Sequence, residues 1–129
     1  TTRAPKIHMT AEWADRNPNM DDMPRGSSHW RCILQYKGRR MTVPFSQGPA
    51  ISCEPTAHDV LTCLVSDSSG ADEDFEDWCR DLGYDTDSRK AERVYRAVQR
   101  QTASLRRLLA EDFDEISRTD EDALKAWCA

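Results

Sequence analysis

The sequence predicts an α+β domain in which an N-terminal antiparallel β-hairpin or three-stranded sheet packs on about three helices. Apolar residues alternate with a period of two over residues 30–45, as in a half-buried sheet. They then recur with a helical period from residue 57 onward, and the longest helical run lies near 88–110. A chain of 129 residues has room for one hydrophobic core. These three observations favour strands followed by helices around one core.

The predicted hairpin consists of two alternating segments and a tight turn. Apolar side chains occupy every second position over residues 30–36, and the alternation resumes over 41–45. Lys37-Gly38 lies between the two segments and supplies the turn. Pro44 has no N–H to donate to a ladder, so we expect the second strand at an edge of the sheet.

The positions of Pro, Gly and polar residues divide the chain into three predicted regions. Residues 1–28 are polar and interrupted by Pro, Gly, Asn and Ser, which predicts an irregular arm. Residues 29–110 are expected to form the compact α+β domain, with a short extended piece over 50–53. Residues 111–129 form an acidic C-terminal segment in which two large apolar residues predict a short helix over 121–128.

Each main helix has a start or stop signal of its own. Thr56 begins the first helix with a capping box. The second helix, predicted over 72–82, has an acidic first turn and ends at Gly83, which suits the left-handed C′ position. Thr86 or Asp87 is predicted to cap the third helix. The predicted core consists of Trp30, Leu34, Tyr36, Val43, Phe45, Leu61, Leu64, Phe75, Trp78, Tyr95, Val98, Leu105 and Leu109.

Composition argues against several classes of protein. Hydrophobic residues make up 38% and charged residues 32% of the chain, and no apolar stretch approaches the ~20 residues of a membrane span. No basic start followed by an apolar core indicates a leader peptide. The five cysteines are an odd number without a C-x-x-C pair, which favours free thiols in a reducing cytosol. We therefore expect a cytoplasmic protein without a membrane partner.

The net charge of −5 hides a strong segregation of charge along the chain. Residues 59–87 contain ten acids and one base, residues 89–107 contain seven bases and one acid, and residues 111–122 contain seven acids and one base. Such asymmetry marks partner surfaces in some proteins. The alternative is that two acidic segments offset a basic helix within one domain.

Three stretches carry a resemblance to a known group of proteins. They read G-R-R-M-T-V-P-F-S-Q-G over 38–48, P-T-A-H-D-V-L-T-C-L-V-S-D over 55–67 and D-W-C-R-D-L-G-Y-D-T-D-S-R-K-A over 77–91. Over residues 28–110 the chain resembles a family of short, largely uncharacterised proteins of phages and prophages. The resemblance implies a phage accessory protein in the host cell cytosol and supplies no catalytic residue. Such proteins often bind a host or phage macromolecule, and some inhibit defence systems such as CRISPR effectors.

Clustered carboxylates form the first candidate binding surface. On a short helix they can imitate a nucleic-acid backbone, occupy a basic groove and speed association through complementary charge. The alternative is a solvated face that keeps the protein soluble. The candidates lie on the predicted second helix and after the third: Asp72, Glu73, Asp74, Glu76, Asp77, Asp81, Glu111, Asp112, Asp114 and Glu115.

An arginine stripe on the longest helix is the second candidate surface. At 100° per residue its members gather opposite the apolar face, where they could track phosphates or grip an acidic partner. The alternative is an exposed face neutralised by neighbouring acids. The arginine stripe consists of Arg89, Arg93, Arg96, Arg100 and Arg107.

Catalytic and metal-binding patterns are weak. His29 and His58 could pair with Cys53 or Cys63 as in a cysteine hydrolase, but no family signature surrounds these cysteines. The spacing from Cys53 through His58 to Cys63 lacks the closely spaced ligand pairs of a zinc site. No phosphate-binding glycine motif is present. The sequence therefore predicts no enzyme activity, no cofactor and no metal.

The leading hypothesis is a non-enzymatic phage accessory protein that acts in the manner of an anti-CRISPR inhibitor. It would bind a host protein or ribonucleoprotein complex and cover a basic nucleic-acid site with its acidic surface. One alternative is a nucleic-acid-binding module that uses the arginine stripe. Another is a phage structural or assembly protein.

Overall fold

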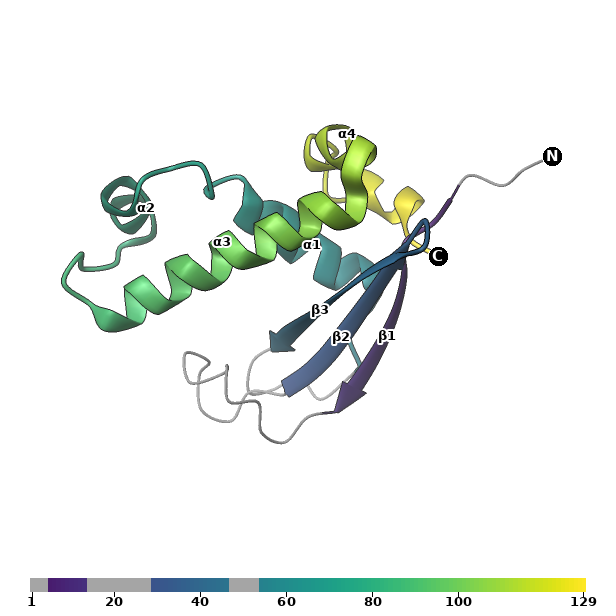
Figure 1. The fold of residues 1–129 in the computed structure, drawn as a ribbon, viewed down its shortest axis with the longest axis horizontal. Helices are drawn as coiled ribbons and strands as arrows, with labels where there is room; N and C mark the ends of the chain where they lie inside the picture. The colour runs from purple at the N-terminus through teal and green to yellow at the C-terminus, as the bar shows by residue number, and fades with distance from the viewer. Residues whose placement is uncertain (1–4, 14–28, 47–53) are drawn as a thin grey trace.

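The computed structural model describes residues 5–13, 29–46 and 54–129, and it confirms the α+β class. An antiparallel sheet has the strand order β1 (His8–Trp13), β2 (His29–Tyr36), β3 (Arg39–Ser46). The main helices are α1 (Ala57–Ser68), α2 (Phe75–Leu82) and α3 (Arg89–Leu109). Helix α3 packs against α1 and β3, whereas α2 lies at the end of α3 that is farther from the sheet (Figure 1). The extended piece predicted over 50–53 lies outside the described residues.

The β2–β3 hairpin confirms the predicted alternation and turn. Tyr36 pairs with Arg39, so Lys37 and Gly38 form a two-residue turn, in which both have positive φ angles, of 49° and 79°. Such turns match the twist of the strands that they join. β3 lies at an edge of the sheet, as Pro44 predicts. Every second side chain of the hairpin is buried in the core: Cys32, Leu34, Tyr36, Met41 and Val43.

Strand β1 corrects the prediction of an irregular arm over residues 1–28. Residues 8–13 pair with β2 along their whole length. Met9 and Ala11 are half-buried and pack against the core, while Thr10 between them is exposed. Two moderately apolar positions give a weak alternation in the sequence, and pairing with β2 decides the conformation.

Side-chain caps set the starts of α1 and α2. The Thr56 hydroxyl accepts from the Asp59 N–H at 3.1 Å, and the Asp59 carboxylate accepts from the Thr56 N–H at 2.9 Å, which confirms the predicted capping box. Helix α2 begins at residue 75 rather than 72. The reason is that the Asp74 carboxylate caps it and accepts from the Asp77 N–H at 2.9 Å.

The prediction that Thr86 or Asp87 caps α3 is wrong, because Ser88 does so. The Ser88 hydroxyl accepts from the Ala91 N–H at 3.2 Å. Asp87 lies in the preceding turn, where its N–H donates to the Asp85 carboxylate at 3.0 Å. An Asp side chain that bonds to the backbone two residues on stabilises a turn rather than a helix start.

The C-terminal residues pack into the main core rather than forming a segment of their own. The short helix predicted over 121–128 is a 3-10 helix over 123–127. Ile116 and Leu124 are buried, and the Ile7 N–H donates to the Trp127 carbonyl oxygen at 2.7 Å. This region contains η1 (Ala110–Asp112), α4 (Phe113–Ser117) and η2 (Ala123–Trp127).

Buried apolar side chains form two clusters. The larger lies between the sheet, α1 and the C-terminal half of α3, and it includes Leu34, Leu61 and Leu105. The smaller lies between α2 and the N-terminal half of α3, and it includes Trp78 and Val98. Nine of the thirteen predicted core residues are buried, and the half-buried exceptions are Trp30, Phe45, Phe75 and Tyr95.

Candidate functional site

A cavity of about 440 Å³ lies between the end of α1, helix α2 and the N-terminal half of α3. Apolar and aromatic side chains line it together with three carboxylates, and we name it the acidic cleft. Ligand pockets in proteins have volumes of about 300–1,000 Å³, so the acidic cleft lies at the small end of this range. Its walls include Trp78, Leu82, Tyr84, Val94 and Val98, and its carboxylates are those of Asp67, Glu73 and Asp81.

Trp78 anchors the apolar wall of the acidic cleft. This residue is 4% exposed, and its indole stacks on the Tyr84 ring with centroids 5.3 Å apart and planes at 7°. The Tyr95 ring meets the indole edge-on at 5.2 Å. Gly83 ends α2 in the left-handed conformation, with a φ of 77°, and the Tyr84 N–H donates to the Cys79 carbonyl oxygen at 2.8 Å. This helix end turns Tyr84 back onto Trp78.

Side chains of α3 hold the loop that carries Glu73. The Tyr95 hydroxyl donates to the Glu73 carbonyl oxygen at 2.6 Å. The Gln99 amide donates to the Ala71 carbonyl oxygen at 2.6 Å, one helical turn farther along α3. These two bonds fix the loop backbone against α3 and place the Glu73 carboxyl beside that of Asp81.

The Asp81 carboxyl lies within hydrogen-bonding reach of the Glu73 carboxyl. A hydrogen bond with Asp81 raises the pKa of Glu73, and burial and the negative charges of Asp81, Asp77 and Asp74 act in the same direction. The buried Oε2 atom of Glu73 has no hydrogen-bond partner among the described residues. Burial also raises the pKa of Asp67. The acidic cleft therefore disfavours its own negative charge.

The other acids predicted on the second helix have different tasks. Asp77 pairs with Arg80 at 3.1 Å, and Asp72 pairs with Arg106 at 3.3 Å. Asp74 caps α2, and Glu76 is exposed on it. Within residues 5–13, 29–46 and 54–129, no basic side chain forms an ion pair with the carboxylates of the cleft, Asp67, Glu73 and Asp81.

Asp67 is a cleft residue that the sequence analysis missed. It lies in the last turn of α1, which contains no basic residue. A helix dipole disfavours an acid at this position, since the C-terminal end is negative. An acid at a helix C-terminus is therefore the sequence signal that could have identified it.

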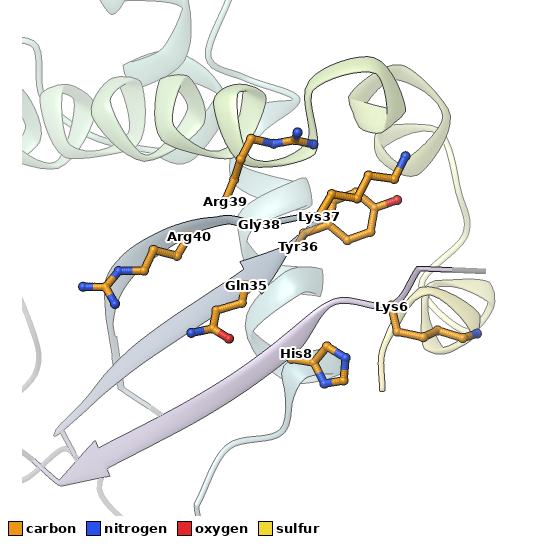
Figure 2. A pocket seen from close by; sticks show the side chains of 8 residues that line it. All are labelled: Lys6, His8, Gln35, Tyr36, Lys37, Gly38, Arg39 and Arg40. Atoms are coloured by element: carbon orange, nitrogen blue, oxygen red, sulfur yellow. The ribbon is translucent and has the colours of Figure 1, made fainter. Parts of the chain in front are cut away.

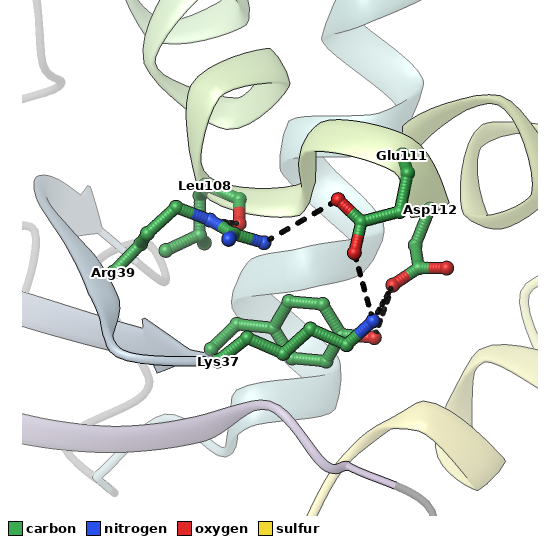
Figure 3. A network of polar contacts seen from close by, with 6 residues as sticks. Lys37, Arg39, Leu108, Glu111 and Asp112 are labelled. Atoms are coloured by element: carbon green, nitrogen blue, oxygen red, sulfur yellow. Dashed lines mark hydrogen bonds and ion pairs between the residues drawn. The ribbon is translucent and has the colours of Figure 1, made fainter.

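The negative charge of a second pair of carboxylates, those of Glu111 and Asp112, is neutralised by a lysine of the same chain. The Lys37 ammonium donates to Glu111 at 2.9 Å and to Asp112 at 2.8 Å (Figure 3). The Tyr36 hydroxyl donates to Asp112 at 2.6 Å, and the Arg39 Nε donates to the Leu108 carbonyl oxygen at 2.8 Å. We name the contacts of Tyr36, Lys37, Arg39, Glu111 and Asp112 the Lys37 junction.

The Lys37 junction shifts pKa values opposite to those of the acidic cleft. Hydrogen bonds from Lys37 lower the pKa of Glu111, and bonds from Lys37 and Tyr36 lower that of Asp112. Burial and the bond to Asp112 raise the pKa of Tyr36 to about 12. These carboxylates tie the hairpin turn to the end of α3.

The structure does not bring the two acidic groups together. Helix α2 lies near the N-terminal end of α3, and η1 and α4 follow its C-terminal end (Figure 1). Val94 and Val98 of the cleft lie 15 and 11 residues before the end of α3, so about 17–23 Å of helix separates the cleft from that end. Asp114 and Glu115 are exposed on α4, which follows the C-terminal end of α3. Asp72 lies between the two groups, because it pairs with Arg106 near that end of α3.

The arginine stripe lies on α3 as predicted, and all five members are exposed. It faces away from the buried residues of the helix, which include Ala91, Val98 and Leu105. From Arg89 to Arg107 the stripe extends about 27 Å along the axis. Arg96 pairs with Glu92 at 2.5 Å, one helical turn earlier.

A basic depression of about 350 Å³ lies at the hairpin turn. Figure 2 shows Lys37 and Arg39 extending toward the helices, where the Lys37 junction holds them. Lys6 donates to the carbonyl oxygen of Ala126. Structural contacts thus engage three of the basic side chains in this depression, which leaves Arg40 and His8 on the outer face of the sheet.

Of the residues considered for catalysis, the structure describes the side chains of His58 and Cys63. The His58 ring is hydrogen-bonded to the Glu121 carbonyl oxygen at 2.6 Å, and Cys53 lies outside the described residues. Burial raises the pKa of Cys63, opposite to the shift of an activated nucleophile. In the part of the chain that the structure describes, no group of three or more His, Cys, Asp or Glu side chains could hold a metal ion. No helix there is long and apolar enough to cross a membrane.

Comparison of the chain with protein-family models, with curated proteins and with solved structures finds no match. The resemblance to phage proteins therefore stays a prediction from the sequence.

Proposed function

We propose that this protein is a non-enzymatic binding protein that covers a basic, nucleic-acid-binding surface of a partner with its α2 end. One observation carries the proposal: no basic side chain among the described residues compensates the carboxylates of the acidic cleft. Buried or crowded negative charge is unfavourable in the free protein, and a cationic partner relieves it. The resemblance to phage proteins supports a host defence complex as the partner, in the manner of an anti-CRISPR inhibitor.

Complementary charge supplies the proposed mode of inhibition. Asp85 is exposed next to Tyr84 of the cleft wall, and Glu76 is exposed on the face of α2 that points away from the cleft, so both add to the negative charge of the α2 end. A negative surface speeds encounter with a basic groove, and salt weakens this attraction. Once seated, the protein body blocks access of nucleic acid to the groove.

Charge reversal at the α2 end tests the proposal. Immobilised wild-type protein and a Glu76→Lys, Asp81→Lys double variant are compared for capture of proteins from a bacterial lysate at two salt concentrations. We expect the wild type to retain a nucleic-acid-binding protein that salt or competing DNA releases, and the double variant to lose it. Both positions are exposed, and neither caps a helix nor forms an ion pair within the described residues, so the variant should fold.

The matched control is Asp114→Lys with Glu115→Lys on α4. It makes the same change in net charge at the opposite end of α3 and should capture as the wild type does. Equal loss in both double variants would show that only net charge matters. Full capture by the α2 variant would reject the proposal.

The arginine stripe supports a second candidate function, which is direct binding of nucleic acid. The observation in its favour is that five exposed guanidinium groups follow one line opposite the core. Phosphate contacts of this kind depend steeply on salt. A gel shift with duplex DNA at low salt tests it, with Arg89→Glu, Arg100→Glu as the variant. Arg40→Glu, Arg118→Glu is the control outside the stripe. No shift by the wild type would exclude this function.

A further inference from the structure

We infer that the acidic cleft receives one arginine side chain of the partner protein. The inference rests on the proposed function for the existence of a partner, and it adds the chemical group that the α2 end recognises. The carboxylates line a cavity between three helices and not an open surface, so we expect a single side chain to be the ligand.

The polar part of the cavity requires a ligand that donates several hydrogen bonds. The buried Oε2 atom of Glu73 has no donor, and the Asp81 carboxyl lies beside it. Asp67 lines another part of the same cavity, at the end of α1. A guanidinium group has five N–H donors in a planar fork and can bond to more than one carboxylate at once. An anion or a neutral acceptor would leave these oxygens without donors.

The apolar part of the cavity suits the rest of an arginine side chain. Val94 and Val98 of α3, with the exposed Leu82 of α2, line the space beside the carboxylates. Long basic side chains bury their methylene groups against apolar surface while the charged end reaches polar groups. The volume of about 440 Å³ accommodates a side chain but not a helix, which is about 10 Å wide.

A bare metal ion fits the cleft less well. Calcium takes six to eight oxygen ligands at short range. The described residues contain no group of three or more His, Cys, Asp or Glu that could hold a metal ion, and apolar side chains occupy much of the cleft wall. The mixed lining therefore favours an organic cation.

Peptide titration followed by NMR tests the inference on the full chain. The probes are Ac-Ala-Arg-Ala-NH2, the same peptide with citrulline in place of arginine, and calcium chloride. We expect the arginine peptide to shift the resonances of Trp78, Leu82 and Val94 in saturable fashion. Citrulline keeps the shape and loses the charge, so it should bind at least about tenfold more weakly.

Two variants assign the binding to the cleft. Asp81→Asn is nearly isosteric and should weaken the arginine peptide about tenfold or more, whereas Asp114→Asn on α4 should leave it unchanged. Val94→Phe fills the cavity, keeps every charge and should abolish binding. Thermal melting shows that each variant is folded.

Five outcomes would overturn the inference. Four come from the titrations: no saturable shift, equal binding of arginine and citrulline peptides, tighter binding of calcium than of the arginine peptide, or peptide binding that survives Val94→Phe. Self-association that Asp81→Asn abolishes would make a second copy of this chain the occupant and would also overturn it. The lysate capture in the preceding subsection can fail without the peptide titration failing. If the arginine peptide binds but no partner is captured, the cleft inference stands and the proposed inhibitory function is rejected. If a partner is captured but the arginine peptide does not bind, the proposed function stands and the cleft inference is rejected.

Discussion

Two pairs of carboxylates lie at opposite ends of α3, and their surroundings differ. Glu111 and Asp112 surround the Lys37 ammonium, which lowers the pKa of both. Glu73 and Asp81 face each other with no basic partner among the described residues, and this arrangement raises the pKa of Glu73. The first pair joins the hairpin to the helices, whereas the second pair lines a cavity.

This difference separates a structural contact from a binding site. A compensated pair already has its cation, so another ligand would have to displace it. An uncompensated pair in a cavity retains unsatisfied acceptors, and such perturbed groups are typical of functional sites. In the sequence both pairs read as runs of Asp and Glu, because the cation of the first pair lies 75 residues before Asp112.

Removing the aromatic support of the acidic cleft should have the largest effect. Truncation of a buried aromatic side chain costs about 3–5 kcal/mol, and Trp78→Ala removes the centre of the smaller apolar cluster. We expect amide hydrogens of α2 to lose most of their exchange protection. Those of β2 and β3 should keep theirs, since the larger cluster does not include Trp78. Hydrogen exchange measured by mass spectrometry checks this.

Leu105→Ala is the control for that prediction. Leu105 lies in the larger cluster, so its truncation should lower the free energy of unfolding by about 2–5 kcal/mol and weaken protection throughout the chain. Loss of protection in β2 on Trp78→Ala would mean that the two clusters unfold as one unit. In that case the cleft could not be altered without loss of the whole fold.

Weakening the Lys37 junction should have an intermediate effect. Tyr36→Phe removes the hydroxyl that donates to Asp112 and should lower the free energy of unfolding by about 1 kcal/mol. Urea denaturation at pH 7 measures it. Tyr84→Phe is the matched control, because the Tyr84 hydroxyl forms no hydrogen bond within the described residues. Equal effects of the two variants would contradict a structural role for the junction.

Most of the fold could be predicted because its signals are local. Alternation predicts the β2–β3 hairpin, Pro44 predicts its edge position, and Thr56 and Gly83 predict helix ends. β1 was not predicted, since its six residues become a strand through pairing with β2 rather than through their own pattern. The packing of the C-terminal region likewise depends on contacts with distant residues.

For the candidate site, the sequence predicts which charged residues lie on which helix but not which of them contact one another. The sequence indicates acids on α2 and arginines on α3, and both groups lie on those helices. It does not show which acids are paired, since Asp72 meets Arg106 across 34 residues. It also groups Glu111 with the α2 acids, although Glu111 follows α3 and binds Lys37 of the hairpin turn. Compensation of charge is a three-dimensional property.

The smallest expected effect is on the pH dependence of stability, and it tests whether the two pairs of carboxylates differ as described. A raised pKa means that the folded protein binds the Glu73 proton more tightly than the unfolded chain does. Ionisation of Glu73 therefore reduces stability as the pH rises from the ordinary carboxyl pKa, about 4.3, through the raised value. Glu73→Gln should slightly stabilise the protein at pH 7 and have no effect at pH 3.

Asp112→Asn should change stability in the opposite direction. The pKa of Asp112 is lowered in the folded protein, so its contribution is complete above the ordinary carboxyl pKa and is lost as the pH falls through the lowered value. The variant should therefore be less stable than the wild type at pH 7, with a difference that shrinks in acid. Thermal melting of both variants from pH 3 to pH 7 measures the two curves. If both substitutions change stability in the same direction at pH 7, the contact with Lys37 does not make the two pairs of carboxylates different. Curves of opposite sign would show that Asp112 gains stability from a cation within the fold and that Glu73 does not.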